Sequence, residues 1–196
     1  MPLPVIYFIR HGVTHANVRG LMSGNTETDL TPQGISQAQS SGVFLGQFPI
    51  LRFFVSDLRR TRQTWQALGL NLPVSFDARL REINFGQLEN LPYKEKPKDL
   101  NFEALYYHRS LRYPAGDSFL DIQSRLVSFI KDCLEGQPGP VGIVAHGTVG
   151  RALLLQTASS CQPQDIFPLE LKNGEVLRIA DGRFERLFTP DNSPAS

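Results

Sequence analysis

Short apolar runs that end abruptly at polar residues predict a buried sheet with functional groups along one edge. Residues 4–9, 52–55 and 140–145 have the length and composition of buried strands. The carboxyl ends of parallel strands meet at one edge of a sheet, where functional groups gather in α/β folds. We therefore expect one shared pocket for the polar residues that follow the three runs, which are Arg10-His11-Gly12, Ser56-Asp57 and His146-Gly147.

Helical patterns lie between these runs. Thr31-Pro32 reads as an N-cap with proline at the first helical position, and the helix should continue to about Gly46. A second helix is predicted over residues 58–68, closing near Gly69, and a later one around residues 152–155. Ser118 and Asp121 resemble a capping box, and apolar residues follow them at helical spacing, namely Phe119, Ile122, Leu126, Phe129 and Ile130.

Strands that alternate with helices indicate an α/β fold. We predict a three-layer α/β/α sandwich with a mostly parallel sheet and helices on both faces. Residues 10–29 and 86–115 should be loops or irregular, and a hairpin should join 176–180 to 184–188 around Asp181-Gly182. We expect one domain over residues 1–188 and a flexible tail over 189–196.

Composition narrows the classes of partner. The 196 residues carry a formal net charge of +1, so no bulk attraction to nucleic acid or to an anionic membrane is expected. No apolar run approaches the length of a membrane span, and no signal peptide is visible. Cys133 and Cys161 lack metal-ligand spacing; a disulfide is possible, but two buried free thiols in a reducing, cytoplasmic setting fit better.

The predicted pocket suits a phosphate monoester, which is close to doubly negative near pH 7. Arg10 and Arg60 could each hold two phosphate oxygens, because the guanidinium is a planar fork of donors. A neutral imidazole such as that of His11 can attack phosphorus and split hydrolysis into two easier steps. Glu82, in the segment 80–86, could carry the proton that the leaving group needs.

Six segments in the same order resemble the histidine phosphatase superfamily, the phosphoglycerate-mutase-like group. The resemblance extends from about residue 5 to about residue 157. The segments are Arg10-His11-Gly12 with Thr14 and Asn17; Asp29 to Gly34 with Gln37-Ala38; Ser56 to Thr64; Leu80 to Gly86; Gly116-Asp117-Ser118 with Asp121 and Arg125; and Val144 to Gly147. Asp117 stands where that family usually has Glu.

The resemblance implies a role for each matching residue. His11 would be the nucleophile and Glu82 the proton donor and acceptor, while Arg10, Arg60 and His146 would clamp the phosphate. No metal ion and no organic cofactor is implied. Positions that line the substrate would be Asn17, Ser23, Gly24, Gly147 and, by likeness to the fructose-2,6-bisphosphatase branch, Arg112.

Several residues have plainer interpretations. Arg59 or Arg62 could take the place of Arg60, and Glu82 could simply pair with a neighbouring arginine, Arg79 or Arg81. Arg112 could be a solvated charge beside a turn. His15 and His108 are expected to be incidental, or at most to face the substrate.

The sequence favours a phosphomonoesterase acting on a small phosphorylated metabolite through phosphohistidine, with a fructose-2,6-bisphosphatase-like sugar phosphatase as one alternative. A 2,3-bisphosphoglycerate-dependent mutase would keep the same residues, but mutases of this fold usually carry a longer insertion than the segment between Glu89 and Ser118. A non-catalytic phosphate-binding module should lack the nucleophile, the clamp or the proton carrier, and none is missing. Substrate identity and oligomeric state are not readable.

Overall fold

The computed structural model describes residues 3–95, 97, 101, 104–105 and 108–191. Most of the predicted flexible tail, residues 192–196, lies outside this set. The described chain forms a six-stranded sheet in the order β3-β2-β4-β1-β5-β6. Its strands are β1 (Ile6–Arg10), β2 (Arg52–Val55), β3 (Val74–Phe76), β4 (Val141–Ala145), β5 (Val176–Ala180) and β6 (Arg183–Phe188).

The prediction of a mostly parallel sheet is confirmed. The strands β1, β2, β3 and β4 run parallel, and β5 and β6 add an antiparallel hairpin beside β1. Strand β3 was not predicted, because only three residues form it and none of them is fully buried. The three apolar runs became β1, β2 and β4, which lie next to one another in the sheet.

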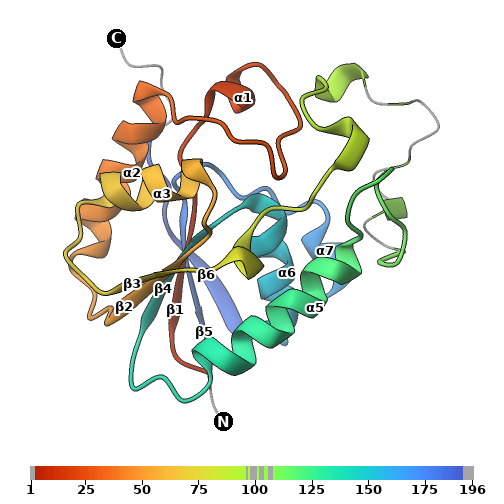
Figure 1. Ribbon diagram of the computed structural model, residues 1–196. Helices are drawn as coiled ribbons and strands as arrows, with labels where there is room; N and C mark the ends of the chain where they lie inside the picture. Colours follow the sequence, from red (N-terminus) through yellow and green to blue (C-terminus); the bar gives the residue numbers. More distant parts are fainter. Residues whose placement is uncertain (1–2, 96, 98–100, 102–103, 106–107, 192–196) are drawn as a thin grey trace.

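Helices cover both faces of the sheet, as Figure 1 shows. The helices α2 (Pro32–Leu45) and α3 (Arg59–Leu68) pack together on one face, over a core that includes Leu45, Phe53 and Leu68. The helices α5 (Phe119–Phe129) and α6 (Gly147–Thr157) cover the other face, together with the short α7 (Pro163–Ile166). The three-layer α/β/α prediction is therefore confirmed.

Local signals explain where the helices begin. Thr31 caps α2 by accepting from the Gly34 amide, and Ser118 and Asp121 form the expected capping box of α5. Helix α5 continues as a π-helical turn over Ile130–Leu134. The helix predicted around residues 152–155 starts earlier than expected, at Gly147, so its first amide groups lie at the carboxyl edge of the sheet.

The segments predicted as loops contain short helical turns. Helix α1 (His15–Val18) lies within residues 10–29, with Thr14 as its cap. Three 3-10 turns follow β3 along the chain, namely η1 (Ala78–Leu80), η2 (Gly86–Leu88) and η3 (Tyr93–Glu95). Together with α1, the segment from η2 to η3 lies above the carboxyl ends of the parallel strands (Figure 1). These short turns border the cavity described below.

Candidate active site

His11 and His146 lie side by side at the carboxyl edge of the sheet. The parallel register pairs Arg10 with Ala145, so each histidine follows one member of the same pair. Their ring centroids are 5.2 Å apart and the rings meet edge to face. Both rings are buried, with 5% of His11 and none of His146 exposed. The sheet therefore brings together two residues that are far apart in sequence.

Hydrogen bonding fixes the protonation of the His11 ring. Its Nδ1 atom lies 2.8 Å from the carbonyl oxygen of Gly12, which can only accept, so Nδ1 carries the hydrogen. The other nitrogen, Nε2, then has a free lone pair. Burial lowers the pKa of His11 well below its usual value, and the charges of Arg60 and Arg10 lower it further. His11 is therefore a neutral imidazole at pH 7.

Arg60 is the arginine that turns inward from α3, with 1% of its surface exposed. Arg59 is exposed near Asp29, and the Arg62 guanidinium lies over the Phe76 ring at 4.0 Å. The structure thus selects Arg60 over the two alternative registers. Burial lowers the pKa of Arg60 to about 10, so it remains charged at neutral pH.

His146 is held between Arg60 and Ser56. Arg60 Nε donates to His146 Nδ1 at 3.2 Å, so the hydrogen of this ring is on Nε2, which donates to Ser56 Oγ at 2.9 Å. Burial, followed by the charge of Arg60, lowers the pKa of His146 well below its usual value. Ser56 was seen in the sequence only as a polar residue after a strand, and its partner depends on tertiary structure.

A cavity of about 340 Å³ opens beside His11. It is lined by Arg10, His11, Asn17, Gly20, Leu21, Met22, Ser23, Glu82, Phe85 and Tyr93. Arg60 and His146 are not in this lining. They lie behind His11 in the interior, so the predicted clamp divides into a cavity-facing part and a buried part.

Arg10 belongs to the cavity-facing part. Its Nη1 donates to the Leu171 carbonyl, while its buried Nε has no hydrogen-bond partner among the described residues. Burial lowers the pKa of Arg10, and the Glu82 carboxylate opposes that effect. Gly147 lies next to this guanidinium, because a Cβ atom at that position would be 3.7 Å from Arg10 Nε.

The loop at residues 171–175 supports Arg10 and His11 from behind, a contact that the sequence did not reveal. Asn173 Nδ2 donates to the His11 carbonyl at 2.8 Å, and the Gly174 amide donates to the Arg10 carbonyl at 2.9 Å. The buried carboxylate of Glu175 closes this loop by accepting from the Lys172 amide and from Arg186. The backbone of the predicted nucleophile is thus held by residues more than 150 positions away.

Glu82 lines the same cavity with its carboxylate held in place. Oε1 accepts from the Ile83 amide at 2.9 Å, and Oε2 accepts from the Thr148 amide, in the first turn of α6, at 3.2 Å. The neighbouring arginines are engaged elsewhere, because Arg81 pairs with Asp57 at 2.6 Å and Arg79 pairs with Asp77 at 2.7 Å. The plainer interpretation of Glu82 as their ion-pair partner is therefore wrong.

The loop at residues 23–26 surrounds the Arg60 guanidinium. Arg60 Nη2 donates to the Gly24 carbonyl at 2.7 Å and to the Ser23 carbonyl at 3.3 Å, and Nη1 donates to the Thr26 carbonyl at 3.0 Å. Gly24 lies so close to Ile83 that a Cβ atom would be 1.9 Å from the Ile83 carbonyl oxygen. Ser23 reaches the cavity, whereas Gly24 is buried and acts through its backbone.

Glu89 holds this loop and was not singled out as a site residue. Its carboxylate accepts from the amides of Asn25 and Thr26, both at 2.9 Å, and from the Phe85 amide at 3.0 Å. The Thr26 hydroxyl donates to it as well. One carboxylate therefore joins the arginine-binding loop to the segment that follows Glu82.

The remaining predicted residues divide clearly. Asn17 lines the cavity, and its Oδ1 accepts from Thr14, which leaves the Nδ2 donors for a ligand. Arg112 does not line this cavity; it pairs with Asp121 at 2.8 Å and is largely exposed. The structure therefore supports the plainer interpretation of Arg112. His15 and His108 are exposed outside the cavity.

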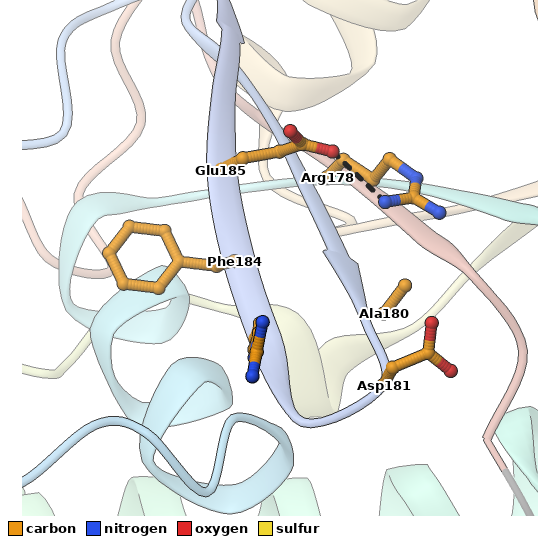
Figure 2. A pocket seen from close by; sticks show the side chains of 6 residues that line it. Arg178, Ala180, Asp181, Phe184 and Glu185 are labelled. Carbon is orange, nitrogen blue, oxygen red and sulfur yellow. Dashed lines mark hydrogen bonds and ion pairs between the residues drawn. The ribbon is translucent and has the colours of Figure 1, made fainter.

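A larger hollow of about 480 Å³ lies on the β5–β6 hairpin, where Arg178 and Glu185 pair at 2.9 Å (Figure 2). Ile179 pairs with Ile6 at the start of β1, so the hairpin turn is at the opposite end of the sheet from His11. Among the described residues, no His, Cys, Asp and Glu side chains are grouped as a metal site requires. Cys133 and Cys161 are free thiols, and Cys133 is only partly buried.

A mostly parallel α/β/α sandwich with paired histidines and a buried arginine at its carboxyl edge defines the phosphoglycerate-mutase-like class. The chain belongs to the histidine phosphatase superfamily (branch 1), whose family model matches residues 6–186. This superfamily acts on small phosphorylated substrates and contains mutases and phosphatases. No helix in the described part of the chain is long and apolar enough to cross a bilayer.

Known relatives carry both kinds of name. "Probable phosphoglycerate mutase GpmB" of Salmonella choleraesuis is 30% identical over 185 residues, which is 89% of this chain and 83% of that protein. A phosphoglycerate mutase structure from Thermus thermophilus is 29% identical, with a TM-score of 0.74 over 95% of this chain and 99% of that one. A candidate alpha-ribazole-5'-P phosphatase from Escherichia coli shares the fold, with a TM-score of 0.77 over 99% of both chains at 22% identity.

Proposed function

We propose that the protein is a phosphomonoesterase that hydrolyses a small phosphorylated metabolite through a phosphohistidine on His11. The hydrogen bond from His11 Nδ1 to the Gly12 carbonyl carries the proposal, because it leaves the Nε2 lone pair free in a ring that lines the cavity. A neutral, oriented imidazole is what attack on phosphorus requires. The depressed pKa of His11 keeps it in that form.

The cavity offers donors for the phosphoryl oxygens. Arg10 and Asn17 are lining residues that can donate to phosphoryl oxygens, and the helix dipole of α6 adds positive potential at its first turn. Arg60 and His146 act from behind, where the Arg60 charge keeps the His11 ring neutral. This arrangement would stabilise the negative charge of the transferring group.

In the first step, the Nε2 lone pair forms a bond to phosphorus while the bond from phosphorus to the ester oxygen breaks. The leaving oxygen takes the proton of a protonated Glu82 and departs as an alcohol. In the second step, water attacks phosphorus and gives a proton to the Glu82 carboxylate, and the bond between Nε2 and phosphorus breaks. Inorganic phosphate is released, and both side chains return to their starting forms.

A phosphoglycerate mutase is the second candidate, favoured by the names of the sequence relatives. A mutase would return the phosphoryl group from His11 to the bound intermediate instead of to water. Incubation with 3-phosphoglycerate and a trace of 2,3-bisphosphoglycerate separates the two candidates. A phosphatase releases inorganic phosphate, whereas a mutase forms 2-phosphoglycerate with little release.

The proposed mechanism is tested by covalent trapping. Brief incubation with a ³²P-labelled monoester, followed by quenching in alkali, should leave acid-labile label on the wild-type protein and none on His11→Ala. Turnover of His11→Ala should also be lost. His15→Ala is the matched control, because His15 is exposed outside the cavity, and it should label normally. Turnover by folded His11→Ala would overturn the mechanism.

A further inference from the structure

A second, smaller cavity adjoins the one beside His11. Its volume is about 100 Å³, and Phe85 and Tyr93 line both cavities. Further walls come from Tyr113, Phe119 and Phe167. For scale, an apolar protein cavity of about 150 Å³ accommodates benzene. This aromatic slot is smaller than that, so it has room for one edge of a small ring, with the rest of the ring in the adjoining larger cavity.

Arg151 places a cation in the wall of the aromatic slot. It lies four residues after Gly147 on α6, so both residues are on the same face of the helix. Arg151 Nε donates to the Leu169 carbonyl at 2.8 Å, which fixes the side chain. Among the described residues, its two terminal nitrogens have no hydrogen-bond or ion-pair partner.

Arg151 forms no ion pair with any other described residue. Its field reaches Arg10, whose pKa it lowers, and also the Tyr93 and Tyr113 hydroxyls. Two guanidinium groups close together in a partly desolvated site repel each other, which costs stability unless an anion binds between or beside them. Arg10 already has the transferring phosphate as its ligand in the proposed reaction, so Arg151 lacks an anion of its own.

We propose that the aromatic slot and Arg151 form the leaving-group subsite, which selects a phosphate monoester whose alcohol part carries a planar ring with an acidic substituent. The inference rests on the proposed phosphatase function. Phe85 and Tyr113 already touch edge to face, with ring centroids 5.0 Å apart. The ligand ring would therefore lie against this pair and Tyr93, and its anionic group would accept from the terminal nitrogens of Arg151. Glycerol-type phosphates would leave the aromatic walls unused.

Three phosphate esters test the subsite. The ester of 4-hydroxybenzoic acid carries a ring and a carboxylate, its methyl ester carries the ring alone, and glycerol 2-phosphate carries neither. We expect wild-type kcat/KM to be about tenfold or more higher for the carboxylate than for its methyl ester, the gain of one charge-assisted hydrogen bond. Because the charge is partly exposed to solvent, this ratio should fall as salt is added. Glycerol 2-phosphate should be poorest.

Variants assign the preference to Arg151. Arg151→Met should bring the ratio between the two aromatic esters close to one, and Arg151→Lys should restore part of it. Tyr113→Leu should lower both aromatic esters relative to glycerol 2-phosphate. Arg112→Met is the matched control, because Arg112 pairs with Asp121 outside both cavities, and its ratio should match wild type.

The outcomes separate the two proposals. Hydrolysis of all three esters at equal kcat/KM, or a carboxylate preference that survives in Arg151→Met, would overturn the subsite and leave the phosphatase function standing. Absence of phosphate release and of His11 labelling with every ester would overturn the function itself. If Arg151→Met does not fold, the salt dependence of the wild-type ratio still decides the question.

Discussion

The Nε–H group of Arg60 points at Nδ1 of His146 over 3.2 Å, and both side chains are almost completely buried. An arginine can only donate, so the proton of His146 must be on Nε2, facing Ser56. The Gly12 carbonyl imposes the opposite choice on His11. Two adjacent imidazoles thus carry their protons on different nitrogens, and only His11 has a nitrogen free for chemistry.

Nitrogen NMR can detect this assignment directly. Two-bond couplings between ¹⁵N and the ring protons should show His11 protonated on Nδ1 and His146 on Nε2 at pH 7, with neither ring an imidazolium. Replacement of Ser56 by Ala removes the acceptor of a buried N–H, and unfolding free energy should fall by about 1–3 kcal/mol. Ser36→Ala, at an exposed site on α2, should be neutral. An imidazolium at either position would contradict the assignment.

The buried histidines should make stability depend on pH. Their pKa values in the folded protein are well below the value of about 6.5 in the unfolded chain. Below pH 6.5 the unfolded chain therefore binds protons that the folded chain excludes, so unfolding free energy falls as pH decreases. Above pH 6.5 the effect disappears. Linkage sets the slope at up to ~1.4 kcal/mol per pH unit for each histidine.

Urea titrations between pH 5 and 8 measure this slope. His11→Asn should reduce it below pH 6.5 by the share of one histidine, and His15→Asn, at an exposed position, should not. The window lies above the range in which depressed carboxyl pKa values, such as that of Asp57 beside Arg81, affect stability. A flat profile from pH 5 to 7 would show that the two rings bind as many protons in the folded protein as in the unfolded chain, which would contradict the lowered pKa values.

The loss of rate on replacing Glu82 should increase with the basicity of the leaving oxygen, because a more basic oxygen needs a proton to depart. We expect Glu82→Gln to lose about 10²-fold or more with an alkyl phosphate, and far less with p-nitrophenyl phosphate, which departs unprotonated. Steady-state kinetics with both substrates gives the comparison. Glu185→Gln, on the distant hairpin, serves as the control. Equal losses with the two substrates would mean that Glu82 positions other groups but transfers no proton.

Glu89 should act on Arg60 through the intervening loop. Glutamine offers one acceptor oxygen where the carboxylate offers two to the amides of Asn25, Thr26 and Phe85. We expect Glu89→Gln to destabilise the fold by about 1.5–3 kcal/mol. It should also lower kcat more than it changes KM, because the loop whose carbonyls hold the Arg60 guanidinium would be less fixed. Glu89→Asp should recover part of kcat. Glu135→Gln, on the surface, is the control.

Features set by local sequence or by the geometry of a parallel sheet could be predicted from the sequence, and features set by tertiary contacts could not. The histidines at residues 11 and 146 were predicted to meet because strand ends converge in any parallel sheet, and they do. Gly147 was found through the same edge, whereas Glu82 was predicted from the segment 80–86 and the family resemblance. Arg112 was predicted as a substrate contact, and in the structure it pairs with Asp121 and does not line the cavity, because the turn before α5 places the two side chains together.

Other residues were missed because tertiary contacts alone give them a role. Nothing local marks Glu89, whose carboxylate joins two loops, or Asn173, which reaches the His11 carbonyl. The four-residue spacing between Gly147 and Arg151 could have predicted that both lie on one side of a helix, and therefore that Arg151 lies near the site. Recognising that α6 begins directly after His146 would have directed attention to it.

The position of β1 has a consequence for how the enzyme comes into being. This strand carries Arg10 and precedes His11, yet it lies between β4 and β5, which are both synthesised after α2, α3 and α5. Asn173 and Gly174, which donate hydrogen bonds to the His11 and Arg10 carbonyls, are synthesised after the helices from α1 to α7. Such long-range pairing slows folding. A nascent chain that ends before residue 173 would contain His11 but lack the residues that hold its backbone in position.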